Sequence, residues 1–222
     1  MADGTVLNVC FHGIGTPRRE LEDGEARYWV TTQRYLRILD ELATWPEVRL
    51  SFDDGNASDV DHGLEPLVER GLTATFFLVA ARLGTPGSLT DDDVRALLAR
   101  GMRIGTHGMD HRSWRGMDDG ARRRELVDAR EHLARLSGTA VDEAALPRGE
   151  YDRRVLASLR SLGYAAVHTS DRRPARRGAW LQPRFSVRAT DTPASLRAEV
   201  LAAPSLGRRL ERSVKGAVKR LR

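Results

Sequence analysis

Several features are scarce in this 222-residue chain, and each scarcity excludes a class of protein. The single cysteine, Cys10, cannot form an intramolecular disulfide, so the chain is not a disulfide-stabilised scaffold, and its apolar neighbours predict a buried, inert thiol. The longest apolar stretch, residues 72–83, is well short of the roughly 20 residues that a membrane-spanning helix needs. With only 20 glycines and 9 prolines, the composition is that of a globular protein rather than a collagenous or low-complexity one.

The amino terminus also lacks a secretory signal. It has neither a basic start nor a long apolar core, and Asp3 stands where a signal peptide would carry Lys or Arg. We therefore expect a cytoplasmic protein, and a reducing compartment is compatible with its single cysteine.

Basic charge is concentrated at the carboxyl terminus. The net charge is +5, but residues 207–222 alone contribute +6, which leaves −1 for the rest of the chain. A nearly neutral body lacks the basic footprint of a nucleic-acid-binding protein, so no nucleic-acid partner is expected. The apolar residues of the tail recur at helical spacing. They predict a basic amphipathic C-terminal helix, which either contacts an anionic membrane surface or a partner, or is a solvated terminal helix. We divide the chain into one domain, 1–203, and this tail, 204–222.

Periodicity predicts an α/β fold. Short β-branched and aromatic runs alternate with amphipathic stretches, as in a mostly parallel sheet with crossover helices. The strands are expected at Thr5–Phe11, Val48–Phe52, Thr73–Val79, Met102–Gly105, Ala140–Leu146, Ala165–Thr169 and Leu181–Val187. The helices are expected at Thr32–Thr44, Val60–Arg70, Asp91–Arg100, Arg122–Leu136 and Arg153–Leu162, with Thr90 as the N-cap of one of them.

Two adjacent carboxylates, Asp53 and Asp54, follow the strand Val48–Phe52 and precede Gly55. Neighbouring strand residues point to opposite faces, but a turn at the strand end, which glycine permits, lets both carboxylates approach one point. Two like charges so close are expected where one carboxylate binds a metal ion and the other acts as a base. The alternative is a strand-to-loop turn with an aspartate cap.

A second polar group follows the strand Met102–Gly105. His107 and His111 are four residues apart, a spacing that puts both imidazoles on one side of a helical turn, where they can share a metal ion. Two histidines and one carboxylate leave coordination positions for water and substrate, as in catalytic rather than structural metal sites.

The two segments, SFDDG at 51–55 and HGMDH at 107–111, resemble the first two motifs of the polysaccharide deacetylase family with the NodB homology domain, carbohydrate esterase family 4. The usual forms of these motifs are TFDDG and H(S/T)xxH. The resemblance covers roughly 48–187 and implies a distorted (β/α) barrel, here of about seven strands, with its active site at the carboxyl ends of the strands. It also implies that Asp54, His107 and His111 bind a divalent metal ion, usually zinc, and that Asp53 is the general base.

The resemblance implies a function. In such an enzyme the metal polarises an amide carbonyl and lowers the pKa of a bound water, Asp53 takes the proton, and acetate and a free amine leave. The predicted function is hydrolytic removal of an N-acetyl or related acyl group from an amino sugar, in a glycan or a glycan biosynthetic intermediate. Two alternatives stay open: a deformylase acting on a lipid-linked amino sugar, and a non-catalytic, metal-containing glycan-binding protein.

The chain departs from the family's third motif, typically RPPYG or PYG, which LPRGEYD at 146–152 resembles. Arg148 replaces the usual aromatic residue. Its backbone N–H can still stabilise the oxyanion, and its side chain can bind a phosphate or carboxylate of the substrate. Ala145 stands where many relatives carry an arginine that orients the base. Arg184, in a late strand, is the candidate replacement, and a solvated strand residue is the alternative.

The family's last motif contains a histidine that acts as general acid, whereas this chain has no histidine after His168. His12 ends the first predicted strand at the same rim of the barrel, and some branches of the family begin with a similar strand ending in histidine. We therefore predict that His12 is the general acid. The alternative is a strand-end histidine bonded to backbone.

Aromatic and loop residues near the motifs are candidates for substrate contact. Trp114, Tyr151 and Trp180 are predicted to bind the sugar, with core packing as the alternative for at least one tryptophan. Residues 13–30, a long segment after the first strand, are predicted to form a loop that covers the substrate.

Overall fold

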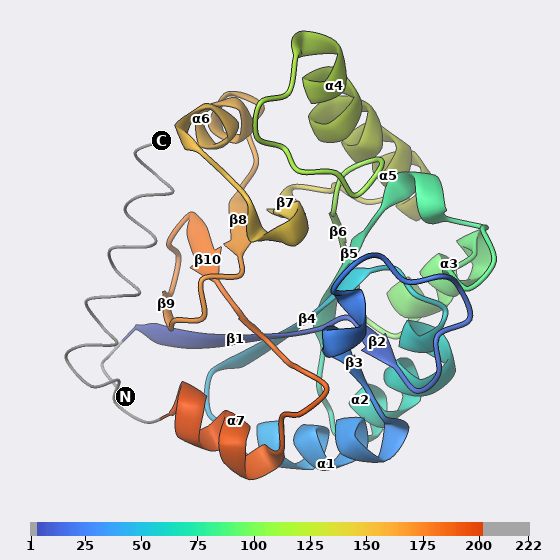
Figure 1. The fold of residues 1–222 in the computed structure, drawn as a ribbon, viewed down its shortest axis with the longest axis vertical. Coiled ribbons are helices and arrows are strands. Elements are labelled where there is room, and N and C mark those ends of the chain that lie inside the picture. The colour runs from blue at the N-terminus through green and yellow to red at the C-terminus, as the bar shows by residue number, and fades with distance from the viewer. Residues whose placement is uncertain (1–3, 202–222) are drawn as a thin grey trace.

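A single curled sheet positions the rest of the molecule (Figure 1). The structure, a computed structural model, describes residues 4–201. The predicted domain boundary after residue 203 and the basic amphipathic tail lie outside them. Parallel strands follow the order β10-β8-β7-β6-β5-β4-β1-β11, and the short strand β9 pairs with β1 in antiparallel fashion. The bounds are β1 Thr5–Phe11, β4 Val48–Asp54, β5 Ala74–Leu78, β6 Arg103–Thr106, β7 Glu143–Ala145, β8 Ala166–Thr169, β9 Ala175–Arg176, β10 Leu181–Pro183 and β11 Phe185–Ser186.

One chain segment closes the barrel. β10 pairs with β8 and β11 pairs with β1, and only Arg184 separates β10 from β11. The Arg184 N–H donates to the Thr169 carbonyl (2.9 Å) on one side, and the Val187 N–H donates to the Cys10 carbonyl (2.8 Å) on the other. The expected barrel-like α/β fold is confirmed. Its sheet path has eight strands rather than seven because the predicted strand Leu181–Val187 divides at Arg184.

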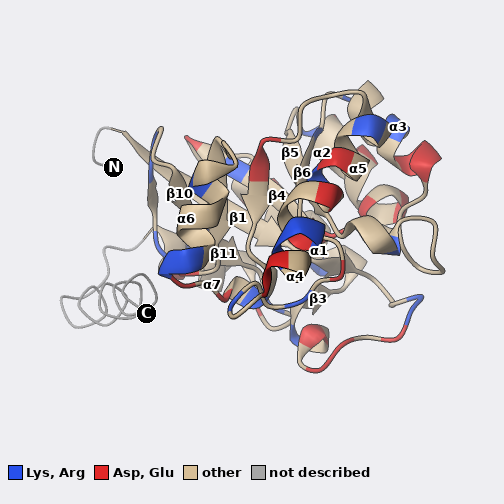
Figure 2. Cartoon of the chain, turned by 90° about the horizontal axis from the view of Figure 1, so that it is seen from above, with Lys and Arg blue, Asp and Glu red and all other residues tan. Residues whose placement is uncertain are grey.

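Helices and loops surround the sheet and carry charged residues of both signs (Figures 1 and 2). The predicted helices at 60–70 and 122–136 each contain a π-helical turn, and a helix near residue 200 and a two-stranded sheet of β2 and β3 were not expected. None of the helices in residues 4–201 is long and apolar enough to cross a membrane. The bounds are α1 Thr32–Leu42, α2 Glu65–Glu69, α3 Asp91–Ala99, α4 Asp119–Arg123, α5 Ala129–Ser137, α6 Arg153–Ser161, α7 Pro193–Val200, β2 Gly13–Ile14 and β3 Trp29–Val30.

Alternation along β4 places polar groups inside the barrel. Phe52 belongs to the main apolar core, where its ring stacks on Phe76 with ring centroids 4.7 Å apart. Its neighbours Ser51 and Asp53 therefore point to the opposite side, where the Arg184 guanidinium donates to both. The main apolar core thus lies between the sheet and the helices, while the interior of the barrel holds polar side chains around the Phe77 ring, over which the Arg184 guanidinium lies.

Close packing inside the barrel predicts that Gly105→Ala destabilises the fold. A Cβ at Gly105 in β6 would lie 2.4 Å from the Phe77 ring and 3.1 Å from the Glu143 carbonyl oxygen. We expect the free energy of unfolding, measured by urea denaturation, to fall by about 1–3 kcal/mol, the usual cost of overpacking.

Gly120→Ala, in the first turn of α4, is the matched control. Its Cβ would contact only Asp118 Oδ1, at 3.5 Å, so the free energy of unfolding should stay the same or rise slightly. Wild-type stability of Gly105→Ala would contradict the packing described for β5, β6 and β7.

Candidate active site

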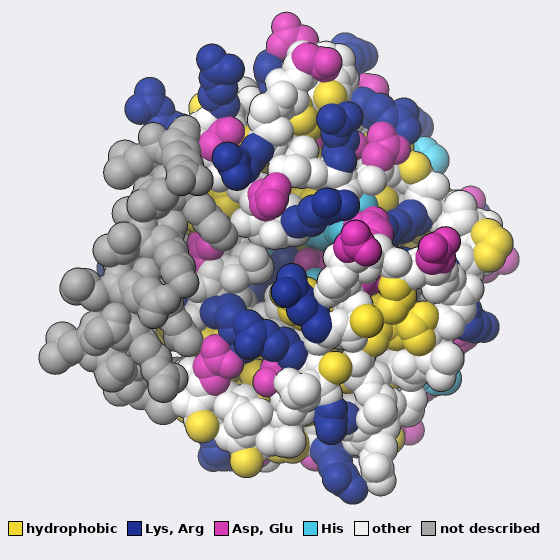
Figure 3. Space-filling model, viewed as in Figure 1, with side chains coloured by type: hydrophobic (Ala, Val, Ile, Leu, Met, Phe, Trp, Pro, Cys, Tyr) yellow, Lys and Arg dark blue, Asp and Glu magenta, His cyan; other side chains and the backbone are white. Residues whose placement is uncertain are grey.

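A cavity of about 300 Å³ opens where the strands end. Figure 3 shows a hollow near the centre of this face, with histidine and acidic side chains inside it and Lys and Arg side chains around it. The carboxyl ends of the strands are where a barrel of this kind places its active site. The lining residues are His12, Glu22, Asp23, Gly24, Glu25, Arg27, Tyr28, Asp53, Asp54, His107, His111, Leu146, Arg148, Gly149, Glu150, Ser170, Arg184 and Ser186.

The backbone at the end of β4 brings two carboxylates into the cavity. Asp54 has a left-handed φ of 80°, and Gly55 follows with 71°. A non-glycine residue rarely adopts this conformation, and such strain is concentrated at functional sites. As a result, neighbours that would point to opposite faces of a regular strand both approach His107. Asp53 Oδ2 lies 3.8 Å and Asp54 Oδ1 3.7 Å from His107 Nε2.

His107 and His111 lie on an irregular turn after β6, not on the helical turn that their spacing predicted. A left-handed φ of 52° at His111 turns the chain, and the two rings are 5.1 Å apart. His107 Nδ1 lies 2.9 Å from the Ala145 carbonyl oxygen, and His111 Nδ1 lies 2.9 Å from Glu22 Oε2. Because a carbonyl and a carboxylate only accept, each Nδ1 carries the proton and each Nε2 offers a lone pair. Burial lowers the pKa of His107 to about 4, which favours this neutral form.

Asp54, His107 and His111 fit a divalent metal ion. Their ligand atoms lie within 4.8 Å of one another. Asp54 Oδ1 is buried without a hydrogen-bond partner, 3.3 Å from His111 Nε2 and 3.7 Å from His107 Nε2. Two imidazole nitrogens and a carboxylate oxygen suit zinc, and three protein ligands leave a position for water or substrate. A cation at this point would satisfy the buried carboxylate oxygen.

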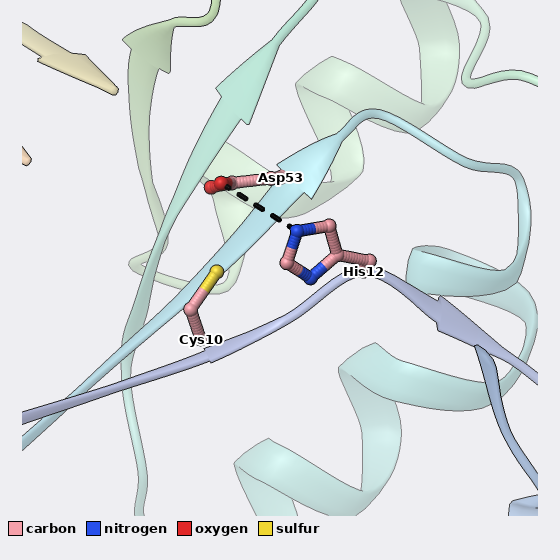
Figure 4. A group of neighbouring side chains, drawn as sticks. All are labelled: Cys10, His12 and Asp53. Atoms are coloured by element: carbon pink, nitrogen blue, oxygen red, sulfur yellow. Dashed lines mark ion pairs between the residues drawn. The ribbon is translucent and has the colours of Figure 1, made fainter. Parts of the chain in front are cut away.

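A second group of potential ligands, Cys10, His12 and Asp53, does not fit a metal ion. Figure 4 shows the Cys10 sulfur and the His12 ring on the side of the Asp53 carboxylate. Both Asp53 oxygens already accept hydrogen bonds from Arg184. Burial raises the pKa of the Cys10 thiol well above its ordinary value, so the sulfur stays protonated and is a weak ligand.

Arg184 holds Asp53 through a buried, bidentate ion pair. Its Nη1 and Nη2 donate to Asp53 Oδ1 and Oδ2 at 2.6 and 2.7 Å, and Nη1 also donates to Ser51 Oγ at 3.0 Å. Arg184 is only 2% exposed. Burial by itself would raise the pKa of Asp53, but the guanidinium outweighs it and holds that pKa well below its usual range. The structure thus places on Asp53 the arginine that was predicted to replace the one absent at Ala145.

A family profile matches more than half of the chain. The profile described as polysaccharide deacetylase aligns with residues 43–167, which contain both carboxylates and both histidines. The chain belongs to the polysaccharide deacetylase family. YxkH of Bacillus subtilis, described as a polysaccharide deacetylase, is 23% identical to it over 124 residues. These residues are 56% of this chain and 44% of YxkH, so the similarity spans less than half of that relative.

Solved structures show that the family fold extends beyond the matched residues. The deacetylase PplD from Streptococcus pyogenes superimposes with a TM-score of 0.76 at 17% identity, over 90% of this chain and 99% of PplD. IcaB from Ammonifex degensii gives a TM-score of 0.72 at 20% identity, over 90% of this chain and 98% of IcaB. At these identities, the similarity establishes the fold of the barrel and not the substrate.

His12 follows β1 directly and lies in the cavity, where it was predicted. Its Nε2 is 4.0 Å from Asp53 Oδ2 (Figure 4). Its ring stacks on Tyr28 with ring centroids 4.7 Å apart. Its Nδ1 is buried without a hydrogen-bond partner, so the ring is not anchored to backbone as the alternative interpretation required. The His12 carbonyl accepts from Asn56 Nδ2 at 3.2 Å.

Arg148 departs from the polysaccharide deacetylase motif in its side chain, while its turn still lines the cavity. Arg148 has a left-handed φ of 57°, and its exposed guanidinium donates to Glu22 Oε2 at 3.2 Å. The next residue, Gly149, has a φ of 64°, and a Cβ there would lie 1.8 Å from Ser170 Oγ. A glycine is therefore required for the turn to pack against the residue that follows β8.

The three aromatic residues predicted to bind substrate lie outside the cavity lining, and two of them, Trp114 and Tyr151, are buried. Trp114 is 1% exposed in a second apolar cluster, and its Nε1 donates to Glu125 Oε2 at 3.2 Å. Tyr151 is buried in the same cluster. Trp180 is half-buried against that cluster, and its Nε1 donates to the Tyr164 carbonyl at 2.8 Å. Their polar atoms bond to the protein itself, so these rings pack rather than face a ligand.

Three further residues at the cavity were not predicted: Glu22, Tyr28 and Arg82. Residues 22–28, part of the 13–30 segment, form one wall of the cavity. Tyr28 supplies the aromatic ring that the predicted tryptophans do not. Arg82 lies in a short helix after β5, with Nη1 3.8 Å from Asp54 Oδ1. The sequence offered one indication of a role for Arg82, namely its position shortly after β5, a strand that ends at the cavity.

The ligand geometry predicts that His107→Ala removes the metal site and that Cys10→Ala does not. After zinc loading and removal of excess metal, the wild type and Cys10→Ala should retain about one zinc per chain. His107→Ala should retain far less, because His107 supplies one of the three ligand atoms and Cys10 supplies none. Elemental analysis of purified protein measures this. Loss of zinc from Cys10→Ala with retention in His107→Ala would place the metal at the second group instead.

Proposed function

We propose that this chain is a metal-dependent hydrolase that removes an N-acetyl or related acyl group from an amino sugar, in a glycan or a glycan biosynthetic intermediate. One observation carries the proposal: Asp53, fixed by Arg184, lies 3.8 Å from the same His107 Nε2 that Asp54 approaches. A carboxylate base beside a three-ligand metal set is an arrangement that can catalyse hydrolysis of an amide by water.

Asp54, His107 and His111 would hold the metal, and zinc is the ion that this ligand set favours. The bound metal would supply Lewis-acid polarisation of the acyl carbonyl and a lowered pKa for water. The chain itself orients the ligands. The Ala145 carbonyl accepts from His107 Nδ1, and Glu22 accepts from His111 Nδ1, so both rings present Nε2 to the same point.

Asp53 is the proposed general base. Arg184 occupies one lone pair on each carboxylate oxygen, and Oδ2 keeps a second lone pair on the side of His12 and His107. The pair keeps Asp53 ionised and prevents it from rotating. Its lowered pKa also makes it a weak base, so it takes a proton efficiently only from a water that is itself acidic.

His12 is the proposed general acid. After the water oxygen has bonded to the acyl carbon and Asp53 has taken a proton, the C–N bond breaks when the nitrogen receives a proton. The His12 ring stacks on Tyr28 and lies in the cavity, with Nε2 4.0 Å from Asp53 Oδ2, where it can donate that proton. The products are a carboxylate and a free amino sugar.

The turn at Arg148 is proposed to contact the substrate in two ways. Its backbone N–H is the candidate donor to the oxyanion that forms when the carbonyl carbon becomes tetrahedral. Its guanidinium, exposed at the rim and bonded to Glu22, is the candidate contact for an anionic group on the sugar.

An acetyl group is the acyl group that the relatives favour. PplD is a deacetylase determined in complex with acetate, the acid that N-deacetylation releases. A deformylase acting on a lipid-linked amino sugar would use the same residues. Parallel assays of N-acetyl and N-formyl forms of one amino sugar separate the two activities, because only the acyl group differs.

Asp53→Asn is expected to abolish turnover while zinc binding persists. Loss of the general base should lower kcat by about 10²–10⁴-fold, measured as free amine released from N-acetylated amino-sugar oligosaccharides, with zinc per chain as the control. An unchanged rate would exclude Asp53 as the base. A wild type that binds zinc and glycan but hydrolyses no acylated sugar would instead favour the non-catalytic glycan-binding alternative.

His12→Gln should lose activity in a way that depends on the leaving group. An amide nitrogen needs a proton to leave, whereas 4-nitrophenolate does not. We therefore expect kcat to fall by about 10²–10⁴-fold on the amide and far less on 4-nitrophenyl acetate. His62→Gln, which changes an exposed histidine outside the cavity lining, is the control and should leave both rates unchanged. Equal losses on amide and ester would contradict the general-acid assignment.

A further inference from the structure

Glu22 joins the loop that walls the cavity to the proposed metal ligands. Its carboxylate lies 3.0 and 2.9 Å from His111 Nδ1 through its two oxygens, and it also accepts from Arg82 and Arg148. The proposed mechanism gives Glu22 no proton transfer and no metal contact of its own, and it belongs to none of the motifs in the sequence. Its side chain is 31% exposed, yet it is the point where four segments of the chain meet.

The two proposed metal-ligand histidines are held by different kinds of partner. His107 donates to a backbone carbonyl of β7, at Ala145, which the sheet fixes. His111 has a strained backbone, with a φ of 52°, and its Nδ1 faces a side chain from a loop 89 residues earlier. The orientation and tautomer of His111 therefore depend on Glu22.

Arg82 makes this dependence specific. Its Nη2 lies 3.4 Å from the same His111 Nδ1. Arginine can only donate, so it cannot bond to a protonated Nδ1, and Glu22 is the group that requires the proton there. Without Glu22, Arg82 could donate to an unprotonated Nδ1, which would move the ring proton to Nε2. That tautomer has no lone pair for a metal at the nitrogen that faces Asp54.

The positive charge of Arg82 also disfavours metal binding unless Glu22 is present to offset it. Arg82 Nη1 lies 3.8 Å from Asp54 Oδ1 and has no hydrogen-bond partner of its own. A guanidinium at this distance opposes a divalent cation on the same oxygen, and more strongly where water is excluded. Glu22 contacts both Arg82 and Arg148 and so offsets the positive charge beside the site.

We propose that Glu22 is a positioning residue for the metal site: it sets the Nδ1-protonated tautomer of His111 and keeps Arg82 from competing for that ring. The inference deepens the proposed function and rests on it, since it assumes that Asp54, His107 and His111 bind a metal. In this role Glu22 acts through His111 and not as a metal ligand.

The test is the zinc affinity of the full-length protein, measured by competition with a chromophoric chelator. Glu22→Ala should weaken zinc binding by about 10–100-fold, the usual effect of removing a carboxylate that orients a ligand histidine. Glu22→Gln should lose less, because the amide oxygen still accepts from His111 Nδ1. The double variant Glu22→Ala Arg82→Met should recover part of the loss, because the competing donor is gone. If Glu22 had a purely structural role, replacing Arg82 as well would not restore the zinc affinity.

Asp23→Asn is the matched control, because it removes the same charge from the same cavity wall and leaves the bonds between Glu22 and His111 in place. Its zinc affinity should equal that of the wild type. Wild-type affinity in both Glu22 variants, a loss in Asp23→Asn as large as in Glu22→Ala, or no recovery in the double variant would each overturn the inference and leave the proposed function standing. A wild type that binds no zinc would overturn both.

Discussion

The buried ion pair between Asp53 and Arg184 is the interaction on which the barrel and its cavity both depend. Arg184 is the single residue between β10 and β11, so the segment that closes the barrel carries this guanidinium into the interior. Removing two charges from water is costly, and such a pair is weak evidence for stability. The pair instead fixes the position of the Asp53 carboxylate. Two charge-assisted hydrogen bonds fix the carboxylate in one orientation, and the same residue links the strands on either side of the closure.

Backbone strain is concentrated at the same end of the barrel. Three of the five non-glycine residues described with a positive φ, Asp54, His111 and Arg148, line the cavity. Each such residue costs on the order of 1–3 kcal/mol, and the surrounding structure must hold it. The sheet holds the chain close to these strained residues. The His107 N–H donates to the Leu78 carbonyl at 2.8 Å, so regular ladder bonding continues until just before the chain turns.

The sequence predicted those features that depend on neighbouring residues, such as strands and the polar residues at their ends. Alternation in the sequence predicted both ends of β1. The two acids at the end of β4 predicted a pair of carboxylates in the cavity, because the carboxyl ends of parallel strands meet. The prediction of a helical turn at His107 was wrong, because the spacing of the histidines does not reveal the left-handed backbone of His111. The substrate role of Trp114 was wrong because its burial depends on partners distant in sequence, such as Glu125, which accepts from its indole. Glu22 could not be predicted at all, since only the folded path of its loop brings it to His111.

The cavity therefore combines rigid and less rigid supports. The partners of Asp53 and His107 belong to the closing segment and to β7, whereas the partner of His111 belongs to a loop held mainly by side chains, among them Arg19, which donates to Glu25 and Asn56. A ligand that contacts the 22–28 wall and a metal held by His111 would share one support. By thermodynamic linkage, if binding of one of them changes the affinity for the other, the second changes the affinity for the first by the same factor. Of the two histidines, only His111 is held by this loop, whereas His107 is held by β7 and Asp53 by the closing segment.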